Sequence, residues 1–515
     1  MDSSSRPALV LVSGRTVGLA ASFAIGIVLA RLFEPALFGT YKQFFLVYAT
    51  LFGVLQLGMA ESLYYFVPKQ PEHTGRYVCN AMATLAAAGL ACTVALHVAR
   101  PALAEWLGPT LAQYVLPLGL FLTFTLISTV LEIVMISRKR HMTAAVTYAL
   151  SDIVRTLLFI IPALAFASLR AVFLGATIFA GLRLAATVVG LWREFGRDFR
   201  IDLSLWRQQL AYALPFALAV GIEVILINYH QYIVAARFDA ATFAVYAIGC
   251  LQIPVFDLIV TSTVNVLMVR MAGAERGRAA LALWHDTVFR LAFLLFPLAV
   301  FLVISARYLI VGLFTATYAA SVPIFMIWVL TMLPAVMAVD AVLRVYAQTR
   351  FMLVMNLVRF VCVAGLIGWF LSMFGLPGAV LVTLVAMAVT KSLGVVRIAR
   401  LMHVGPREAL PWRRLARIAV VAGVSAVPVV GLQWSVSWHP LVTFLAGAAV
   451  YGTGYALLSF GGLHMLGSSD PTVRGFRFSV SRVFQSFTDQ PANRGTRHDT
   501  PNSERGVRVP ANLNT

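Results

Sequence analysis

The sequence predicts an all-α integral membrane protein of about 14 transmembrane helices, arranged as two six-helix lobes in parallel repeat plus two C-terminal helices. Three observations support this fold class. Hydrophobic residues occupy 60% of the 515 positions and charged residues only 12%, about half the roughly 25% that is usual in soluble domains. Apolar stretches long enough to cross a bilayer recur along most of the chain, and a short motif returns after six of them.

Each predicted span holds about 20 mostly apolar residues, because a backbone polar group in hydrocarbon has to be hydrogen-bonded within its own segment. The first span follows the N-terminus with no small-residue cleavage site behind a short apolar core, so we expect a retained helix. The predicted spans are 8–31, 44–67, 77–99, 113–137, 143–166, 171–192, 210–235, 243–269, 286–306, 321–345, 352–373, 376–399, 414–434 and 440–463.

Lysine and arginine are distributed unequally between alternate loops, and this predicts the orientation. One set of loops holds 20 of them, and we call the face that these loops share the basic face: 69–76, 138–140, 193–207, 270–278, 344–350 and 397–417. The other set holds 6, at Arg31, Lys42, Arg100, Arg170, Arg237 and Arg307. Cytoplasmic loops collect positive charge, so we expect the basic face, and with it both chain ends, to be cytoplasmic.

A repeated motif divides the predicted helices. Residues 30–41 read ARLFEPALFGTY at the end of the first span, and residues 236–246 read ARFDAATFAVY at the end of the seventh. Six spans separate the copies, which gives them the same orientation. We therefore predict an N-terminal lobe over 1–200, a C-terminal lobe over 201–403, helices 13 and 14 over 404–466 and a disordered cytoplasmic tail over 467–515.

Several segments resemble one known family. Residues 27–41 (IVLARLFEPALFGTY) with 58–62 (GMAES) are similar to the opening hairpin of polysaccharide flippases of the Wzx type. Residues 374–379 (FGLPGA) resemble the turn before the twelfth helix of these proteins, and 212–215 (YALP) the loop that leads into the seventh. The family belongs to the multidrug/oligosaccharidyl-lipid/polysaccharide (MOP) exporter superfamily, and the resemblance covers roughly residues 8–465.

This resemblance implies a flippase that moves undecaprenyl-diphosphate-linked oligosaccharide across the bacterial inner membrane by alternating access. The product would serve cell-surface polysaccharide assembly, in an O-antigen (lipopolysaccharide) or exopolysaccharide pathway. A central cavity would be lined largely by helices 1, 2, 7 and 8. Expected partners are the lipid-linked oligosaccharide, membrane lipids, and polysaccharide polymerase and chain-length proteins.

Arg15 is the first candidate for binding substrate, because a charge at membrane depth usually faces a cavity or a partner. Gly18, Ser22 and Gly26 share its helical face. A narrow face beside a guanidinium suits a bulky diphosphate headgroup, which accepts paired hydrogen bonds. The alternative is an arginine that extends to the membrane surface above a face of small packing residues.

Acids on three further helices are candidates for substrate binding or ion coupling. Glu61 lies on helix 2, Glu223 and His230 share a face of helix 7, and Asp257 and Asn265 share a face of helix 8. We predict that all five bind substrate, and that Glu223 and Asp257 also carry a proton or sodium ion, as an antiporter would require. The alternative for each acid is a permanent interhelical ion pair.

Other charges within the spans fall into two groups. Asp152 with Arg155, and Asp340 with Arg344, have the spacing of local ion pairs along a helix. Arg183, Arg359 and Lys391 appear as lone cations on helices 6, 11 and 12. Any of the three could help to neutralise a diphosphate. We include only Arg183 among the predicted substrate-binding residues, because Arg359 and Lys391 lie near enough to the basic face to extend to it.

Several function classes find no support in the sequence. The net charge of +19 comes from short loops between apolar spans, so we expect no nucleic-acid partner. We also expect no metal, no cofactor and no catalysis, because the cysteines lie singly in apolar segments and no nucleotide-binding or nucleophile motif stands out. A lipid II or multidrug exporter of the same superfamily remains an alternative. A membrane glycosyltransferase or polymerase is the alternative of a different class, disfavoured by the short loops opposite the basic face.

Overall fold

The computed structural model describes residues 21, 23–138, 140–275, 277–405 and 407–465. Within these ranges the chain is helical and contains no β-strand. Thirteen helical segments are long and apolar enough to cross a membrane, and they match the second to fourteenth predicted spans. Most of the first predicted span, and the predicted tail, lie outside the described residues, although a short apolar helix remains at Phe23–Leu32. The protein is an all-α, multi-pass membrane protein.

The first lobe packs its helices mostly as sequential neighbours, with α4 against α7, α7 against α9 and α8 against α9. A short 3₁₀ turn, η1 (Pro71–His73), precedes α4, and a second, η2 (Gly196–Asp198), follows α9. The helices of this lobe after Phe23–Leu32 are α2 (Pro35–Leu55), α3 (Met59–Lys69), α4 (Thr74–Val98), α5 (Arg100–Leu107), α6 (Pro109–Ala112), α7 (Val115–Ser137), α8 (His141–Phe166) and α9 (Leu169–Phe195).

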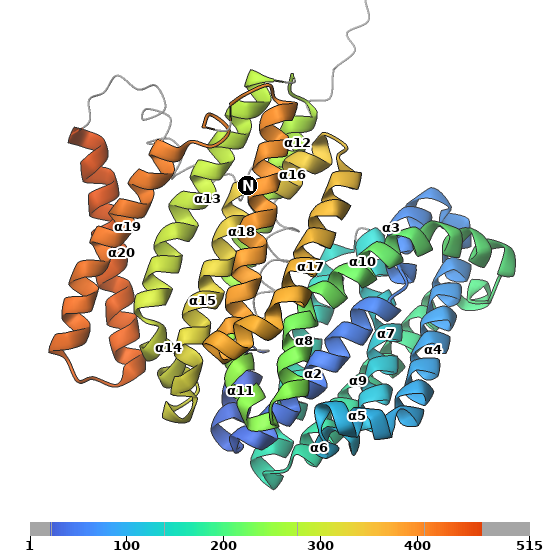
Figure 1. Cartoon of the computed structure of the whole chain (residues 1–515). Helices are drawn as coiled ribbons and strands as arrows, with labels where there is room; N and C mark the ends of the chain where they lie inside the picture. The colour runs from blue at the N-terminus through green and yellow to red at the C-terminus, as the bar shows by residue number, and fades with distance from the viewer. Residues whose placement is uncertain (1–20, 22, 139, 276, 406, 466–515) are drawn as a thin grey trace, which may run out of the picture.

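The helices of the second lobe follow one another as those of the first lobe do. Two C-terminal helices, α19 (Trp412–Ser435) and α20 (Pro440–Met465), pack beside α13 and α14 at the outer edge of the second lobe (Figure 1). Two 3₁₀ segments, η3 (Ala316–Ser321) and η4 (Leu333–Met337), lie on either side of α15. The helices of this lobe are α10 (Leu203–Arg237), α11 (Ala240–Gly249), α12 (Pro254–Ala272), α13 (Arg278–Ile304), α14 (Ala306–Leu313), α15 (Val322–Met332), α16 (Val339–Val345), α17 (Thr349–Phe374) and α18 (Leu376–Leu401).

Three of the predicted spans contain a break in the helix that the apolar pattern did not reveal. The second breaks between α2 and α3, where Leu57 and Gly58 have φ values of 49° and 63°. The eighth breaks between α11 and α12, because Pro254 has no N–H to continue the helix and is suited to a first turn. The tenth breaks at η4 and at Ala338, whose φ is 48°. Helix breaks in transporters expose backbone groups that can bind substrate or ions.

The two copies of the repeated motif pack against each other where the lobes converge, on the face opposite the basic one (Figure 1). Phe38 and Phe243 of these copies are fully buried. A Cβ on Gly39 of α2 would lie only 1.7 Å from the carbonyl oxygen of Ala240 in α11, so the absence of a side chain permits this contact. Arg31 adds a hydrogen bond of 2.8 Å from Nε to the carbonyl of Leu313, at the end of α14.

On the basic face the corresponding halves of helices 2 and 8 pack against different helices. The segment α3 lies against α4, α7 and α10, whereas α12 lies against α13 and α16. Figure 1 shows α3 and α12 well apart at this end of the molecule. The lobes are therefore joined closely near α2 and α11 and diverge toward the basic face.

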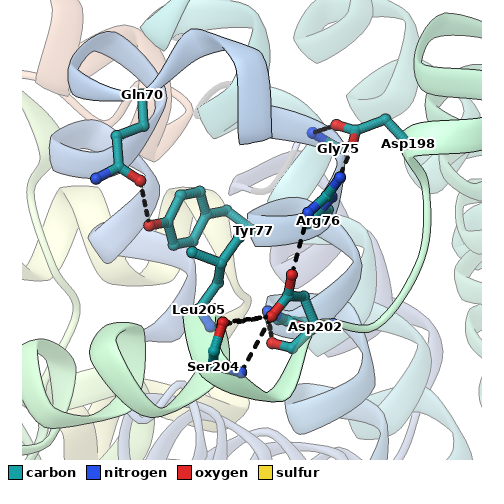
Figure 2. A network of polar contacts seen from close by, with 9 residues as sticks. Gln70, Gly75, Arg76, Tyr77, Asp198, Asp202, Ser204 and Leu205 are labelled. Carbon is teal, nitrogen blue, oxygen red and sulfur yellow. Dashed lines mark hydrogen bonds and ion pairs between the residues drawn. The ribbon is translucent and has the colours of Figure 1, made fainter.

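A polar network on the basic face attaches the beginning of α10 to the first lobe (Figure 2). Arg76 of α4 binds Asp198 at 3.0 Å and Asp202 at 3.2 Å. Asp202 caps α10 by accepting hydrogen bonds from the Ser204 hydroxyl and from the N–H groups of Ser204 and Leu205. These hydrogen bonds, the one from the Ser204 hydroxyl foremost, lower the pKa of Asp202 to about 2.

Contacts along the rest of α10 make it a helix shared by both lobes. Gln209 donates to the Ser62 hydroxyl at 2.9 Å, and Asn228 donates to Thr50 at 3.0 Å. Farther along, Tyr229 packs edge-on against Phe360 of α17, with 5.4 Å between ring centroids. The predicted lobe boundary at residue 200 falls just before this helix, and the division into domains stays a prediction.

Candidate functional site

The acids predicted on helices 7 and 8 lie on surfaces that other protein atoms do not cover. Glu223 is exposed in the middle of α10. Asp257 and Asn265 are exposed on α12. We expected Asp257 in the middle of a continuous helix; it lies instead in the first turn of α12, three residues after Pro254. Negative charge is favoured at that position, because the first N–H groups of a helix have no partners within it.

Glu61 is half-buried in the first turn of α3, directly after the break in the second span. One of its carboxylate oxygens, Oε2, is buried and has no hydrogen-bond partner among the described residues. A buried acceptor without a donor is costly. This oxygen is therefore a place where a proton, a cation or a ligand donor would be stabilising.

His230 differs from its predicted place on an open cavity face, because it is 3% exposed. Its Nδ1 is hydrogen-bonded to the Tyr246 hydroxyl at 2.6 Å, and its ring lies 5.7 Å from that of Trp328. Tyr246 belongs to the repeated motif in α11. His230 thus joins α10 to the packed junction of the lobes.

Arg183 is not the lone cation that the sequence predicts. Its Nη2 donates to Oε1 of Glu132 at 2.5 Å, which links α9 to α7. Both side chains are largely buried, with 22% of the arginine and 9% of the glutamate exposed. We missed Glu132 in the sequence, although a single acid inside an otherwise apolar span is the signal that would have found it.

Asp340 and Lys391 also differ from prediction. Lys391 of α18 binds Asp340 of α16, so the predicted local pair of Asp340 with Arg344 is wrong and Lys391 is not a lone cation. The prediction failed because η4 and the turn at Ala338 direct α16 toward α18. The predicted pair of Asp152 with Arg155 is confirmed, at 2.8 Å within α8.

The two interhelical ion pairs are related by the repeat. In each lobe an acid on the fourth helix binds a cation on the sixth, and 51 positions separate the two residues in both cases. Glu132 with Arg183 is thus the counterpart of Asp340 with Lys391. The sequence motif that revealed the repeat is far from these residues, so the ion pairs support the repeat independently.

Arg359 of α17 remains without such a partner. It lines a small cavity between α10, α17 and α18 together with Tyr229, His230, Phe360 and Thr383. Two acids, Asp340 and Glu223, are close enough to act on it electrostatically. No hydrogen bond or ion pair within 4.0 Å joins Arg359 to any residue that the structure describes. The sequence left two roles open for this residue, neutralising a diphosphate or extending to the basic face.

The predicted site residues that the structure describes are therefore dispersed over α3, α9, α10 and α12. Arg15 lies outside the described residues. Across the described ranges, no hydrogen bond or ion pair joins Glu61, Arg183, Glu223, His230, Asp257 and Asn265 to one another. Over the same ranges no group of three His, Cys, Asp or Glu side chains could hold a metal ion.

Known structures share this fold. The lipid II flippase MurJ in an inward closed conformation superposes with a TM-score of 0.68 at 12% identity, covering 88% of this chain and 99% of that one. An inward-facing multidrug resistance MATE family transporter of the MOP superfamily superposes with a TM-score of 0.59 at 17% identity, covering 77% of this chain and 99% of that one. A MOP superfamily transporter from Pyrococcus furiosus superposes with a TM-score of 0.50 at 16% identity, covering 77% of this chain and 95% of that one.

A comparison with curated proteins found no match to this sequence. A family model described as "Polysaccharide biosynthesis protein" matches residues 28–323, which is more than half of the chain and includes the repeated motif, the α10 helix and the Glu132–Arg183 pair. The chain therefore belongs to the polysaccharide biosynthesis protein family and has the fold of MOP superfamily transporters.

Proposed function

We propose that this protein is a flippase that translocates undecaprenyl-diphosphate-linked oligosaccharide repeat units across the bacterial inner membrane for cell-surface polysaccharide assembly. The observation that carries the proposal is the placement of ionisable side chains at membrane depth, beside helix breaks, in a member of a polysaccharide biosynthesis family. Charge at this depth is expensive and marks paths for polar cargo. A sugar diphosphate is such a cargo.

The arrangement of the lobes supports alternating access. The contact of Gly39 with Ala240 closes the molecule on the face opposite the basic one, while α3 and α12 diverge. In the proposed cycle the substrate enters from the basic face, which is cytoplasmic together with both termini. Its diphosphate is drawn to Arg15 and neighbouring cations, and the polyprenyl chain stays in lipid. Separation of α2 from α11 then releases the sugar on the other side.

Ion coupling is part of the proposal. Glu223 and Asp257 are exposed carboxylates on α10 and α12, and neither forms an ion pair with a described residue. Such groups can bind a proton or a sodium ion in one state and release it in the other. Coupling through them would drive the cycle in one direction.

The test uses the full-length protein in proteoliposomes with a fluorescent undecaprenyl-diphosphate oligosaccharide. Arrival of the sugar at the far leaflet is measured by its sensitivity to an added glycosidase. We expect transport by the wild type and a loss of at least about tenfold in Glu223→Gln and Asp257→Asn, which corresponds to about 1.4 kcal/mol. Asp286→Asn is the matched control, because Asp286 forms an ion pair with Arg290 on α13, one turn away.

Other outcomes separate the alternatives. Transport of lipid II but not of the oligosaccharide lipid would favour the activity named for the structurally similar MurJ. Efflux of cationic drugs alone would indicate a multidrug exporter. Lengthening of the glycan by the purified protein would indicate a polymerase. Any of these results without flipping of the oligosaccharide lipid would refute the proposal.

A further inference from the structure

The two lobes carry different charges on α8 and its counterpart α17, and the repeat makes that difference visible. The shift along the sequence that carries Glu132 to Asp340 and Arg183 to Lys391 carries Asp152 to Phe360. In the first lobe the helix α8 therefore holds an acid and a cation that bind each other. Its counterpart α17 holds no acid. Its cations are Arg350 in the first turn and Arg359 farther along, and the same shift relates Arg359 to Ser151 of α8.

The neighbours of Arg359 do not neutralise it. Asp340 is within electrostatic range but is already bonded to Lys391. Glu223 is also within range, yet it forms no ion pair with Arg359 and its side chain stays exposed on α10. A charge without a partner at membrane depth is strongly disfavoured unless a ligand or water compensates it.

We propose that Arg359 binds the diphosphate of the transported lipid, so that the substrate supplies a negative charge that α17 itself lacks. A guanidinium suits this role, because it donates two parallel hydrogen bonds to phosphate oxygens. This inference rests on the proposed function and adds a second cation to the one predicted at Arg15.

The surroundings of Arg359 determine the direction of approach. The cavity behind it has a volume of about 10 Å³, which is room for one water molecule at most. Tyr229 and Phe360 close it with an edge-on ring contact. A phosphate is too large for this cavity and has to reach the guanidinium from outside it. Glu223 acts on Arg359 electrostatically, so its negative charge opposes a phosphate bound there. Removing the positive charge of Arg359 should therefore weaken phosphate binding, whereas removing the negative charge of Glu223 should strengthen it.

The experiment measures binding to the purified full-length protein in lipid nanodiscs. The probes are undecaprenyl diphosphate, the uncharged lipid undecaprenol and, in detergent, inorganic pyrophosphate followed by thermal shift. We expect Arg359→Gln to weaken binding of undecaprenyl diphosphate by about tenfold or more, Arg359→Lys to retain part of it, and Glu223→Gln to strengthen it several-fold. None should change binding of undecaprenol.

Arg290→Gln is the matched control, since Arg290 binds Asp286 one turn away on α13 and should leave all affinities unchanged. Equal affinity of wild type and Arg359→Gln for undecaprenyl diphosphate would overturn the inference, and would do so even if the wild type transports substrate. Pyrophosphate binding that depends on Arg359, in a protein that fails to flip the oligosaccharide lipid, would leave this site standing and reject the proposed function. Should Arg359→Gln not fold, Arg359→Lys together with the opposite effect of Glu223→Gln decides the question.

Discussion

Two ion pairs neutralise charged side chains across helices, each within one lobe. Arg183 binds Glu132 between α9 and α7, and Lys391 binds Asp340 between α18 and α16. A buried pair adds little net stability, because its attraction is offset by the loss of hydration. Breaking one is expensive, since the remaining charge is then buried alone.

The Glu132–Arg183 pair gives a prediction about stability. Glu132→Gln or Arg183→Gln should each destabilise the protein by about 3 kcal/mol, because each leaves one buried charge without its partner. The double variant should recover much of that loss. Thermal unfolding in detergent measures this, with Asp286→Asn as a control in an exposed pair. Losses that simply add in the double variant would show that the two residues are not coupled.

Asp202 gives a prediction about pH. Hydrogen bonds from Ser204, Leu205 and Arg76 lower its folded-state pKa to about 2, below its usual value of 3.8. The stabilisation is therefore complete above about pH 4 and is lost as the pH falls toward 2. Between about pH 4 and pH 2, the free energy of unfolding should fall less with decreasing pH in Asp202→Asn than in the wild type. Identical curves for both proteins would contradict the role assigned to this carboxylate.

At the scale of elements, interruptions and close contacts distinguish helices 2, 8 and 10 from the continuous ones. The breaks after α2, after α11 and at η4 bring Glu61, Asp257 and Asp340 into the first turns of α3, α12 and α16. Each acid thereby lies where helix N–H groups lack partners within the helix. Helix breaks thus place at helix starts three acids that the span pattern places within the spans.

The contact of α2 with α11 gives a prediction for transport. Gly39→Ala would bring a methyl group against the carbonyl oxygen of Ala240, so the lobes could not close on the face opposite the basic one. We expect transport to fall by at least about tenfold, or about 1.4 kcal/mol, while the protein stays folded. Gly423→Ala on α19 is the control, because nothing lies within 4 Å of the added Cβ there. Unchanged transport in Gly39→Ala would show that this closure is not required.

At the scale of the whole molecule, the repeat relates two lobes that share α10. This helix is attached to the first lobe by Arg76, Asp202 and Gln209, and it reaches α17 of the second lobe at Tyr229. Movement of one lobe against the other must therefore move or bend α10. Pro215 lies inside it and removes one backbone hydrogen bond there. Beyond Pro215, Asn228 still binds Thr50 of α2 in the first lobe.

The predicted orientation can be tested on intact cells. In a background without the native cysteines, Glu105→Cys on α5 should react with a membrane-impermeant maleimide added outside. Arg200→Cys, in the loop before α10, should react only after the membrane is permeabilised. The physical basis is the retention of positively charged loops on the cytoplasmic side. Labelling in the reverse pattern would invert the proposed entry side of the substrate.

Much of the fold was predictable because it depends on local composition. The apolar spans from the second to the fourteenth, the α-helical class and the repeat follow from residue patterns that the bilayer imposes on any such chain. The pair of Asp152 with Arg155 was predictable for the same reason, since three positions along a helix bring two side chains together.

Ion pairs between side chains on different helices were not predictable from local composition. The sequence by itself determined that charges occur at membrane depth in helices 4, 5, 6, 10, 11 and 12, and that both halves of the chain follow one plan. Only the tertiary structure decided that Lys391 neutralises Asp340, that Glu132 neutralises Arg183 and that Arg359 is left over. The physical reason is distance, because an ion pair forms over a few ångströms between residues 51 positions apart, and only helix packing brings such residues together.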